Sequence, residues 1–168
     1  MLKSPKLFSV AFSCLVLISC SNPTPQIDRA PAQNNLGQDL VSMIEKKQGN
    51  PEKVIVKIRS LTNFQWDKMY VFPPYTPIAE INRTLGFEWE DAASTGIDRR
   101  DDINLIVFVN SGKVVTLIAY PRIHGEFSVG DPKNGFTPES ASFEITEVPQ
   151  SQKGRPRLLI MPSSELAN

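Results

Sequence analysis

Apolar residues near the start of the globular part of the chain recur with the spacing of a helix. The pattern predicts a first helix over residues 36–47, with Asn35 at the capping position and with Gly49 and Pro51 after its end. The apolar face of this helix consists of Leu36, Leu40, Met43 and Ile44. We expect this face to be buried.

A second, short helix is predicted over residues 78–85. Thr76-Pro77 provides a capping hydroxyl and a proline suited to a helix start, and Gly86 is typical of a helix end. Residues 88–102 are polar and acidic, which indicates a loop.

Alternating and continuous apolar runs predict the strands. They span residues 53–61, 64–72, 103–109, 114–120, 142–148 and 157–161. The runs 103–109 and 114–120 are apolar at nearly every position, which predicts central strands covered on both faces. Asn110-Ser111-Gly112-Lys113 joins them and favours a type I turn with a left-handed residue and a bulge.

These elements add up to an α+β domain over residues 36–162. We expect a mostly antiparallel sheet of about five or six strands, with two short helices. Residues 163–168 are expected to form a frayed tail.

The first residues have the pattern of a secretory signal. Lys3 and Lys6 precede an apolar stretch that runs from Leu7 to Ile18, and the stretch closes on Leu17-Ile18-Ser19-Cys20. A short transmembrane anchor is the alternative, but the stretch is well below the roughly 20 apolar residues that a spanning helix needs. The closing motif resembles the lipobox of bacterial lipoproteins.

That resemblance implies that residues 1–19 are removed and that Cys20 becomes an acylated first residue. Ser21 stands where many inner-membrane lipoproteins carry an aspartate, so the resemblance favours the periplasmic face of the outer membrane. Residues 20–35 contain three prolines and no aromatic residue, so we expect an extended linker that reaches up to ~45 Å from the bilayer.

Composition excludes several functions. The 18 basic and 18 acidic residues balance, and loss of Lys3 and Lys6 with the signal leaves a net charge of about −2. That charge argues against nucleic-acid binding, which needs a clustered basic surface. Cys14 leaves with the signal and Cys20 carries the lipid, so no thiol is left for a disulfide, a metal or catalysis.

Candidate chemistry is sparse. His124 is the only histidine, and no partner residues at a diagnostic spacing accompany it, so we interpret it as a surface loop residue. The acidic residues of 88–102 could suggest calcium or paired-carboxylate hydrolysis, but interleaved Arg99 and Arg100 favour a solvated loop with local ion pairs. The sequence predicts no catalytic residue, metal or cofactor.

Aromatic residues concentrate between Phe64 and Trp89. Same-parity spacing favours a core role for Phe64, Trp66, Phe72 and Phe87, whereas a recognition surface is the alternative. The candidates for partner binding are Trp66, Tyr70, Tyr75 and Trp89, of which Tyr75 and Trp89 flank helix ends and are expected to be partly exposed. Pro73-Pro74 ends this run, which is typical of a strand at the edge of a sheet. An edge strand can pair with a strand from a partner.

The run from Trp66-Asp67-Lys68 to Pro74-Tyr75-Thr76 resembles a pattern of small bacterial proteins, several of them lipoproteins. Within it, Asp67 and Lys68 are expected to fix the strand entry by hydrogen bonds. We expect a non-enzymatic, membrane-anchored envelope lipoprotein that binds a protein partner or serves envelope assembly. The alternative is an immunity or inhibitor lipoprotein directed against an envelope-targeting enzyme.

Overall fold

The computed structural model describes residues 35–46, 52, 54–130, 132–148 and 157–163. The strands in this part of the chain are β1 (Val54–Lys57), β2 (Lys68–Phe72), β3 (Ile103–Asn110), β4 (Lys113–Pro121), β5 (Glu126–Phe127), β6 (Ser142–Val148) and β7 (Arg157–Pro162). The helices are α1 (Leu36–Glu45) and α2 (Ile78–Leu85), and the 3-10 turns are η2 (Ile58–Leu61), η3 (Glu90–Thr95), η4 (Ile97–Arg99), η5 (Arg122–His124) and η6 (Pro132–Asn134).

The predicted α+β class is confirmed, but the strands of the described residues form two sheets and not one. One has four strands in the order β1-β6-β7-β5, and the other has three in the order β2-β3-β4. All neighbouring strands are antiparallel except β5 and β7. The apolar patterns predicted six of the seven strands and missed the two-residue β5, which is too short to show a pattern. The division of the strands into sheets depends on pairing between distant segments.

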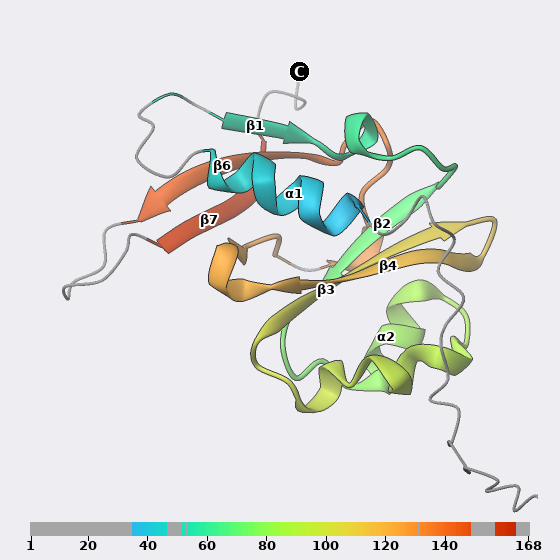
Figure 1. The fold of residues 1–168 in the computed structure, drawn as a ribbon. Coiled ribbons are helices and arrows are strands. Elements are labelled where there is room, and N and C mark those ends of the chain that lie inside the picture. The colour runs from blue at the N-terminus through green and yellow to red at the C-terminus, as the bar shows by residue number, and fades with distance from the viewer. Residues whose placement is uncertain (1–34, 47–51, 53, 131, 149–156, 164–168) are drawn as a thin grey trace, which may run out of the picture.

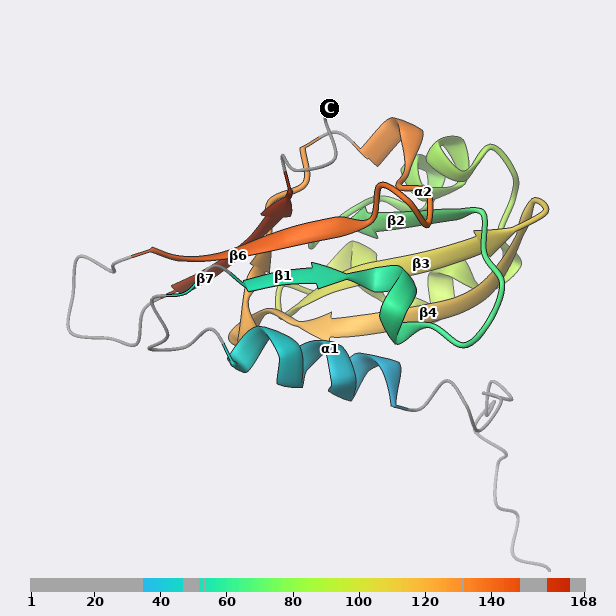
Figure 2. The same cartoon turned by 90° about the horizontal axis from the view of Figure 1, so that it is seen from above.

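The three-stranded sheet is the middle layer (Figures 1 and 2). One of its faces packs against the four-stranded sheet through residues such as Ile106, Phe108 and Tyr120. The other face packs against α2 and the 3-10 turns through residues such as Leu105 and Val107. The predicted central position and the burial of both faces are confirmed for β3, and the four-stranded sheet is the cover that the sequence pattern did not reveal. For β4 the same prediction is wrong, because β4 lies at the edge of the three-stranded sheet and is only partly buried.

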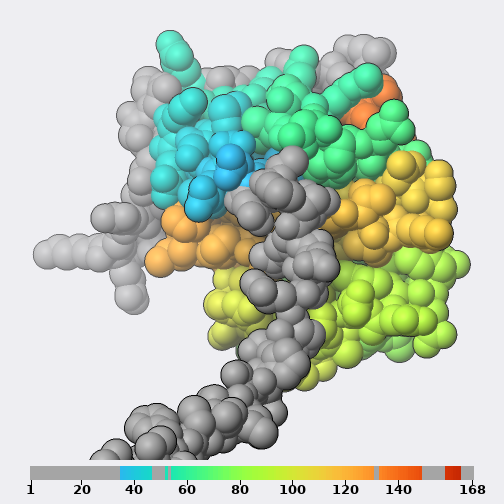
Figure 3. All heavy atoms as spheres, turned by 45° about the vertical axis from the view of Figure 1, so that its right-hand side comes forward, coloured from blue at the N-terminus to red at the C-terminus, as the bar shows by residue number. Residues whose placement is uncertain are grey.

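Helix α1 closes the open side of the sandwich between β1 and β4 (Figures 2 and 3). Its predicted face is confirmed, since Leu36, Leu40 and Ile44 are buried. The predicted cap is wrong, because the Asn35 side chain makes no capping bond. Only the Asn35 backbone oxygen takes part, and it accepts the Asp39 N–H at 2.7 Å.

Strand β1 ends four residues before the predicted limit. The Ser60 hydroxyl donates to the Lys57 carbonyl at 2.7 Å, and the Thr62 hydroxyl donates to the Arg59 carbonyl at 3.2 Å. Such side-chain bonds to nearby backbone favour a turn over a strand. Ile58 is nevertheless buried, as the alternation predicted.

The turn between β3 and β4 differs in type from the prediction. Ser111 and Gly112 have φ angles of 49° and 73°, so both central residues are left-handed. Asn110 pairs with Lys113, which makes a two-residue turn of the mirror-image kind that matches strand twist. The ladder shifts register between Phe108 and Val109, within the strands and not at the turn.

Helix α2 begins and ends close to the predicted limits, but Thr76 does not cap it. The Thr76 hydroxyl donates to the Pro73 carbonyl at 2.6 Å, which stabilises the turn before the helix. Gly86 ends the helix with a φ of 80°, as predicted.

The signal, the lipobox and residues 20–34 of the predicted linker lie outside the described residues, as does the tail beyond Ser163. None of the helices in the described ranges is long and apolar enough to span a membrane.

Candidate functional site

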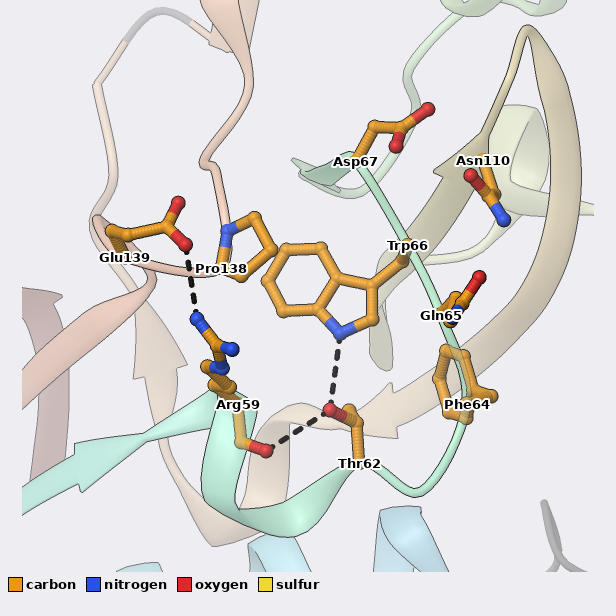
Figure 4. A pocket seen from close by; sticks show the side chains of 9 residues that line it. All are labelled: Arg59, Thr62, Phe64, Gln65, Trp66, Asp67, Asn110, Pro138 and Glu139. Atoms are coloured by element: carbon orange, nitrogen blue, oxygen red, sulfur yellow. Dashed lines mark hydrogen bonds and ion pairs between the residues drawn. The ribbon is translucent and has the colours of Figure 1, made fainter.

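A surface groove of about 390 Å³ lies beside the start of β2 (Figure 4). It forms where the turn after β1, the segment before β2, the β3–β4 turn and the segment before β6 come together. Its lining residues are Arg59, Thr62, Phe64, Gln65, Trp66, Asp67, Asn110, Pro138 and Glu139. The groove therefore depends on four segments that are distant in sequence.

Trp66 forms the rigid floor of this groove. Its indole Nε1 donates to the Thr62 hydroxyl at 3.0 Å, and that hydroxyl donates in turn to the Arg59 carbonyl. On the core side, the indole contacts Phe108 edge-on, with centroids 5.3 Å apart. Phe64 contacts the same Phe108 ring at 5.3 Å. The hydrogen bond fixes the orientation of the indole, and the contact with Phe108 fixes how deeply the ring lies in the groove.

Asp67 and Lys68 fix the strand entry by hydrogen bonds, as predicted. The Asp67 carboxylate accepts the Ser111 N–H at 2.5 Å, and the Asp67 N–H donates to the Val109 carbonyl at 2.8 Å. The Lys68 ammonium donates to the Asn134 carbonyl at 3.0 Å. The Asp67 bond holds the β3–β4 turn against the groove.

An ion pair stands at the rim. Arg59 Nη1 lies 3.0 Å from Glu139 Oε1, and the two side chains are 69% and 71% exposed. An ion pair this exposed contributes little to stability. Arg59 and Glu139 can therefore separate and pair with charged groups of a ligand at little cost in stability.

A second hollow of about 260 Å³ adjoins the groove. The two share Thr62 and Phe64, and the second extends to Asn35 and Asp39 at the start of α1. The concave surface thus reaches from the point where the described domain begins to the Glu139 rim.

The four aromatic candidates have different surroundings. Trp66, Tyr70 and Trp89 are only 6%, 8% and 9% exposed, whereas Tyr75 is 58% exposed. The exposure expected for Trp89 is wrong, because it packs against the α2 layer, and the exposure expected for Tyr75 is confirmed.

The aromatic run does not share one face. Phe64 and Trp66 pack in the core between the sheets, whereas Tyr70 and Phe72 pack in the core under α2. The regular strand begins only at Lys68, so parity counted from Phe64 does not continue into it. Tyr70 stacks on Phe72 with centroids 6.1 Å apart, and burial raises the pKa of the Tyr70 phenol.

β2 lies at the edge of its sheet, as the prolines predicted. Its own chain already covers part of that edge, because Met69 and Phe136 exchange backbone hydrogen bonds at 2.7 Å. Strand addition by a partner is therefore blocked at Met69.

His124 lies in a surface turn, as predicted. Its Nδ1 is 2.8 Å from Glu45 Oε1, which connects η5 to the end of α1. Within the described ranges, no group of three His, Cys, Asp or Glu residues is arranged to hold a metal ion.

The acidic side chains of residues 88–102 are exposed and form local ion pairs, in line with the prediction. The prediction of a loop is wrong for much of the segment, which forms η3 and η4 and buries Ala92 and Ile97 in the core under α2. Arg100 donates to both Asp102 carboxylate oxygens at 2.8 and 2.7 Å. These bonds hold the pKa of the Asp102 carboxyl below its usual value.

Of the groove residues, the sequence pattern identified Phe64, Trp66 and Asp67 as notable, and Asn110 only as part of a turn. Arg59 and Glu139 carried no local signal, because their roles arise from contacts between segments that fold together. Comparison with protein-family models, with curated proteins and with solved structures finds no match to this chain.

Proposed function

We propose that this chain is a lipid-anchored envelope protein that acts without catalysis by binding a segment of a protein partner in the groove around Trp66. The observation that carries the binding role is the groove itself, a rigid aromatic floor below a polar rim. Preorganised sites of this kind lose little conformational entropy on binding.

The rim chemistry suits a polypeptide. Gln65 and Asn110 each carry an amide that can donate and accept, which matches the N–H and C=O groups of a peptide backbone. Arg59 and Glu139 offer one charge of each sign for side chains of the partner. Phe64 and Pro138 add apolar contact area.

The anchor is proposed from the motif Leu17-Ile18-Ser19-Cys20, with attachment through Cys20. We place the lipid in the periplasmic leaflet of the outer membrane. The linker of residues 20–35 would let the groove search for partners up to ~45 Å from the bilayer.

Replacing Cys20 by alanine is expected to move the full-length protein from the membrane fraction to the soluble fraction, because the lipid would be lost. Fractionation followed by immunoblotting measures this, and Cys14→Ala is the matched control, which should stay in the membrane fraction. A Cys20→Ala protein that still sediments with membranes would exclude the lipid anchor.

A photoreactive residue at Gln65 in the full-length protein is expected to form a discrete adduct with one envelope protein. The same residue at Glu80, which is exposed on α2, should not. Arg59→Glu should abolish the adduct by opposing Glu139 at the rim, whereas the exposed control Arg83→Glu should leave it intact. An adduct that is insensitive to Arg59→Glu, or no adduct at Gln65, would refute the groove as a binding site.

A further inference from the structure

The second hollow begins where the described domain begins. Asn35 is the first described residue, and it lines this hollow together with Asp39. The Asn35 side chain makes no capping bond to α1. The hollow shares Thr62 and Phe64 with the groove. The chain that precedes Asn35 therefore joins the domain at one end of a continuous concave surface.

Apolar and charged groups follow one another along this surface. Leu61 and Phe64 are only half-buried, so each presents apolar area to the second hollow. Farther along, the groove carries the ion pair of Arg59 and Glu139 at its rim, with both side chains largely exposed (Figure 4). A segment that lies along the surface from Asn35 meets apolar area first and a pair of opposite charges second.

The residues before Asn35 carry the same two features in the same order. Backwards from Asn35, two amide residues are followed by the small apolar run Ala30-Pro31-Ala32 and then by the opposite charges of Arg29 and Asp28. Short segments that contain proline bind aromatic-lined grooves with little loss of conformational entropy. Seven residues in extended form span up to ~23 Å, which is long enough for Asp28 to reach the rim through both hollows.

We infer that residues 27–34, which lie outside the described residues, occupy the second hollow and the groove in the free protein and compete there with a partner. In the docked state Asp28 takes the place of Glu139 beside Arg59. Arg29 in turn takes the place of Arg59 beside Glu139. Exchange of so exposed an ion pair costs little. The competition rests on the proposed binding role of the groove, whereas the docking itself does not.

Tethering lets weak contacts suffice. A segment joined to its site by a short chain has an effective concentration on the order of 1 mM. If its Kd is about 0.1 mM, the groove is free in about one molecule in ten, and the apparent Kd of a partner rises about tenfold. Docking also shortens the tether, because residues 20–26 alone reach only about 20 Å from the bilayer. Partner binding would then release the domain to the full reach of the linker.

Docking is tested on the full-length protein alone, purified in detergent, with a photoreactive residue at Gln65. The expected result is an intramolecular cross-link to residues 27–34, located by mass spectrometry of the digested protein. The same photoreactive residue at Glu80, which is exposed on α2, should not reach this segment. Equal yields of this cross-link from the two positions would overturn the inference.

Charge exchange separates docking from proximity of the tethered chain. Asp28→Arg and Arg59→Glu should each lower the yield of the Gln65 cross-link about threefold, because each places like charges side by side. The double variant restores the pair with opposite polarity and should recover the yield. Arg83→Glu, an exposed control on α2, should leave it unchanged. Single variants without effect, or a double variant no better than either, would contradict the docking.

The competition is measured separately, on the adduct that Gln65 forms with an envelope protein. Replacing residues 27–31 by Gly and Ser at equal length should raise the yield of this adduct up to about tenfold. An unchanged yield would leave the groove as a binding site and overturn the competition. An intramolecular cross-link without any envelope adduct would support the docking and refute the proposed function.

Discussion

Replacing Phe108 by alanine is expected to lower the free energy of unfolding by about 4 kcal/mol, as measured by urea denaturation. Phe108 is buried in the core between the sheets, and both Phe64 and Trp66 pack edge-on against its ring. Its removal leaves a cavity that the rigid sheet around it can fill only in part.

The same substitution should damage the groove without touching its surface. Without the Phe108 ring, the Trp66 indole has no support on its core side, and its fluorescence emission should shift to the red. Phe143→Ala is the matched control, because Phe143 is equally buried but contacts Phe127 and Phe136. It should cost similar stability and leave the Trp66 signal and binding at the groove unchanged.

The comparison between these two variants tests the link between core and site. If Phe143→Ala weakens binding at the groove as much as Phe108→Ala does, loss of stability alone would explain both. If Phe108→Ala leaves binding intact in the folded protein, the support of Trp66 by Phe108 is not what preorganises the groove.

The elements that the sequence predicted are those governed by local rules. The continuous apolar runs predicted β3 and β4, and Gly86 predicted the end of α2, where it adopts the left-handed conformation. The caps were predicted less well, because Thr76 donates to the turn before the helix and Asn35 contributes only its carbonyl. A capping residue has several nearby partners, and sequence spacing does not choose among them.

The site could not be predicted because its contacts are long-range. Arg59 and Glu139 are 80 residues apart, and Asp67 and Ser111 are 44 residues apart. The pairing of β1 with β6 brings the segments of Arg59 and Glu139 together, and the pairing of β2 with β3 brings Asp67 to Ser111. The spacing of residue types along the chain does not predict such long-range contacts. The aromatic cluster could therefore be recognised from the sequence, but its residues could not be assigned to the core or to the groove.

Replacing Asn104 by valine is expected to raise the free energy of unfolding by about 2 kcal/mol. Asn104 is the second residue of β3, is fully buried, and has no hydrogen-bond partner for either side-chain polar atom among the described residues. Its amide is therefore desolvated without compensation. Valine is an apolar residue of similar size that favours strands.

The residue directly opposite Asn104 is Tyr120, whose buried hydroxyl also lacks a partner in the described part of the chain. Tyr120→Phe is expected to raise stability by about 1 kcal/mol at neutral pH. Because the two residues face each other, the double variant shows whether they act independently. If either single variant is destabilised instead, the two side chains bond to each other or to a shared water in solution.

Tyr120 also predicts how stability depends on alkaline pH. Burial, together with the nearby Glu45 carboxylate, raises the pKa of the Tyr120 phenol above its ordinary value of 10.0. The unfolded chain therefore releases this proton at a lower pH than the folded protein does. The stabilisation is fully present below about pH 10 and is lost as pH rises further, by up to ~1.4 kcal/mol per pH unit.

Denaturation of the wild type and of Tyr120→Phe between pH 8 and 11 measures this contribution. The variant should lose stability more slowly above pH 10, while the slope due to Tyr70, whose pKa burial also raises, should remain in both proteins. Parallel curves would mean that Tyr120 is ionised as easily in the folded protein as in the unfolded chain. That result would contradict the closed packing of α1 over this end of the sandwich.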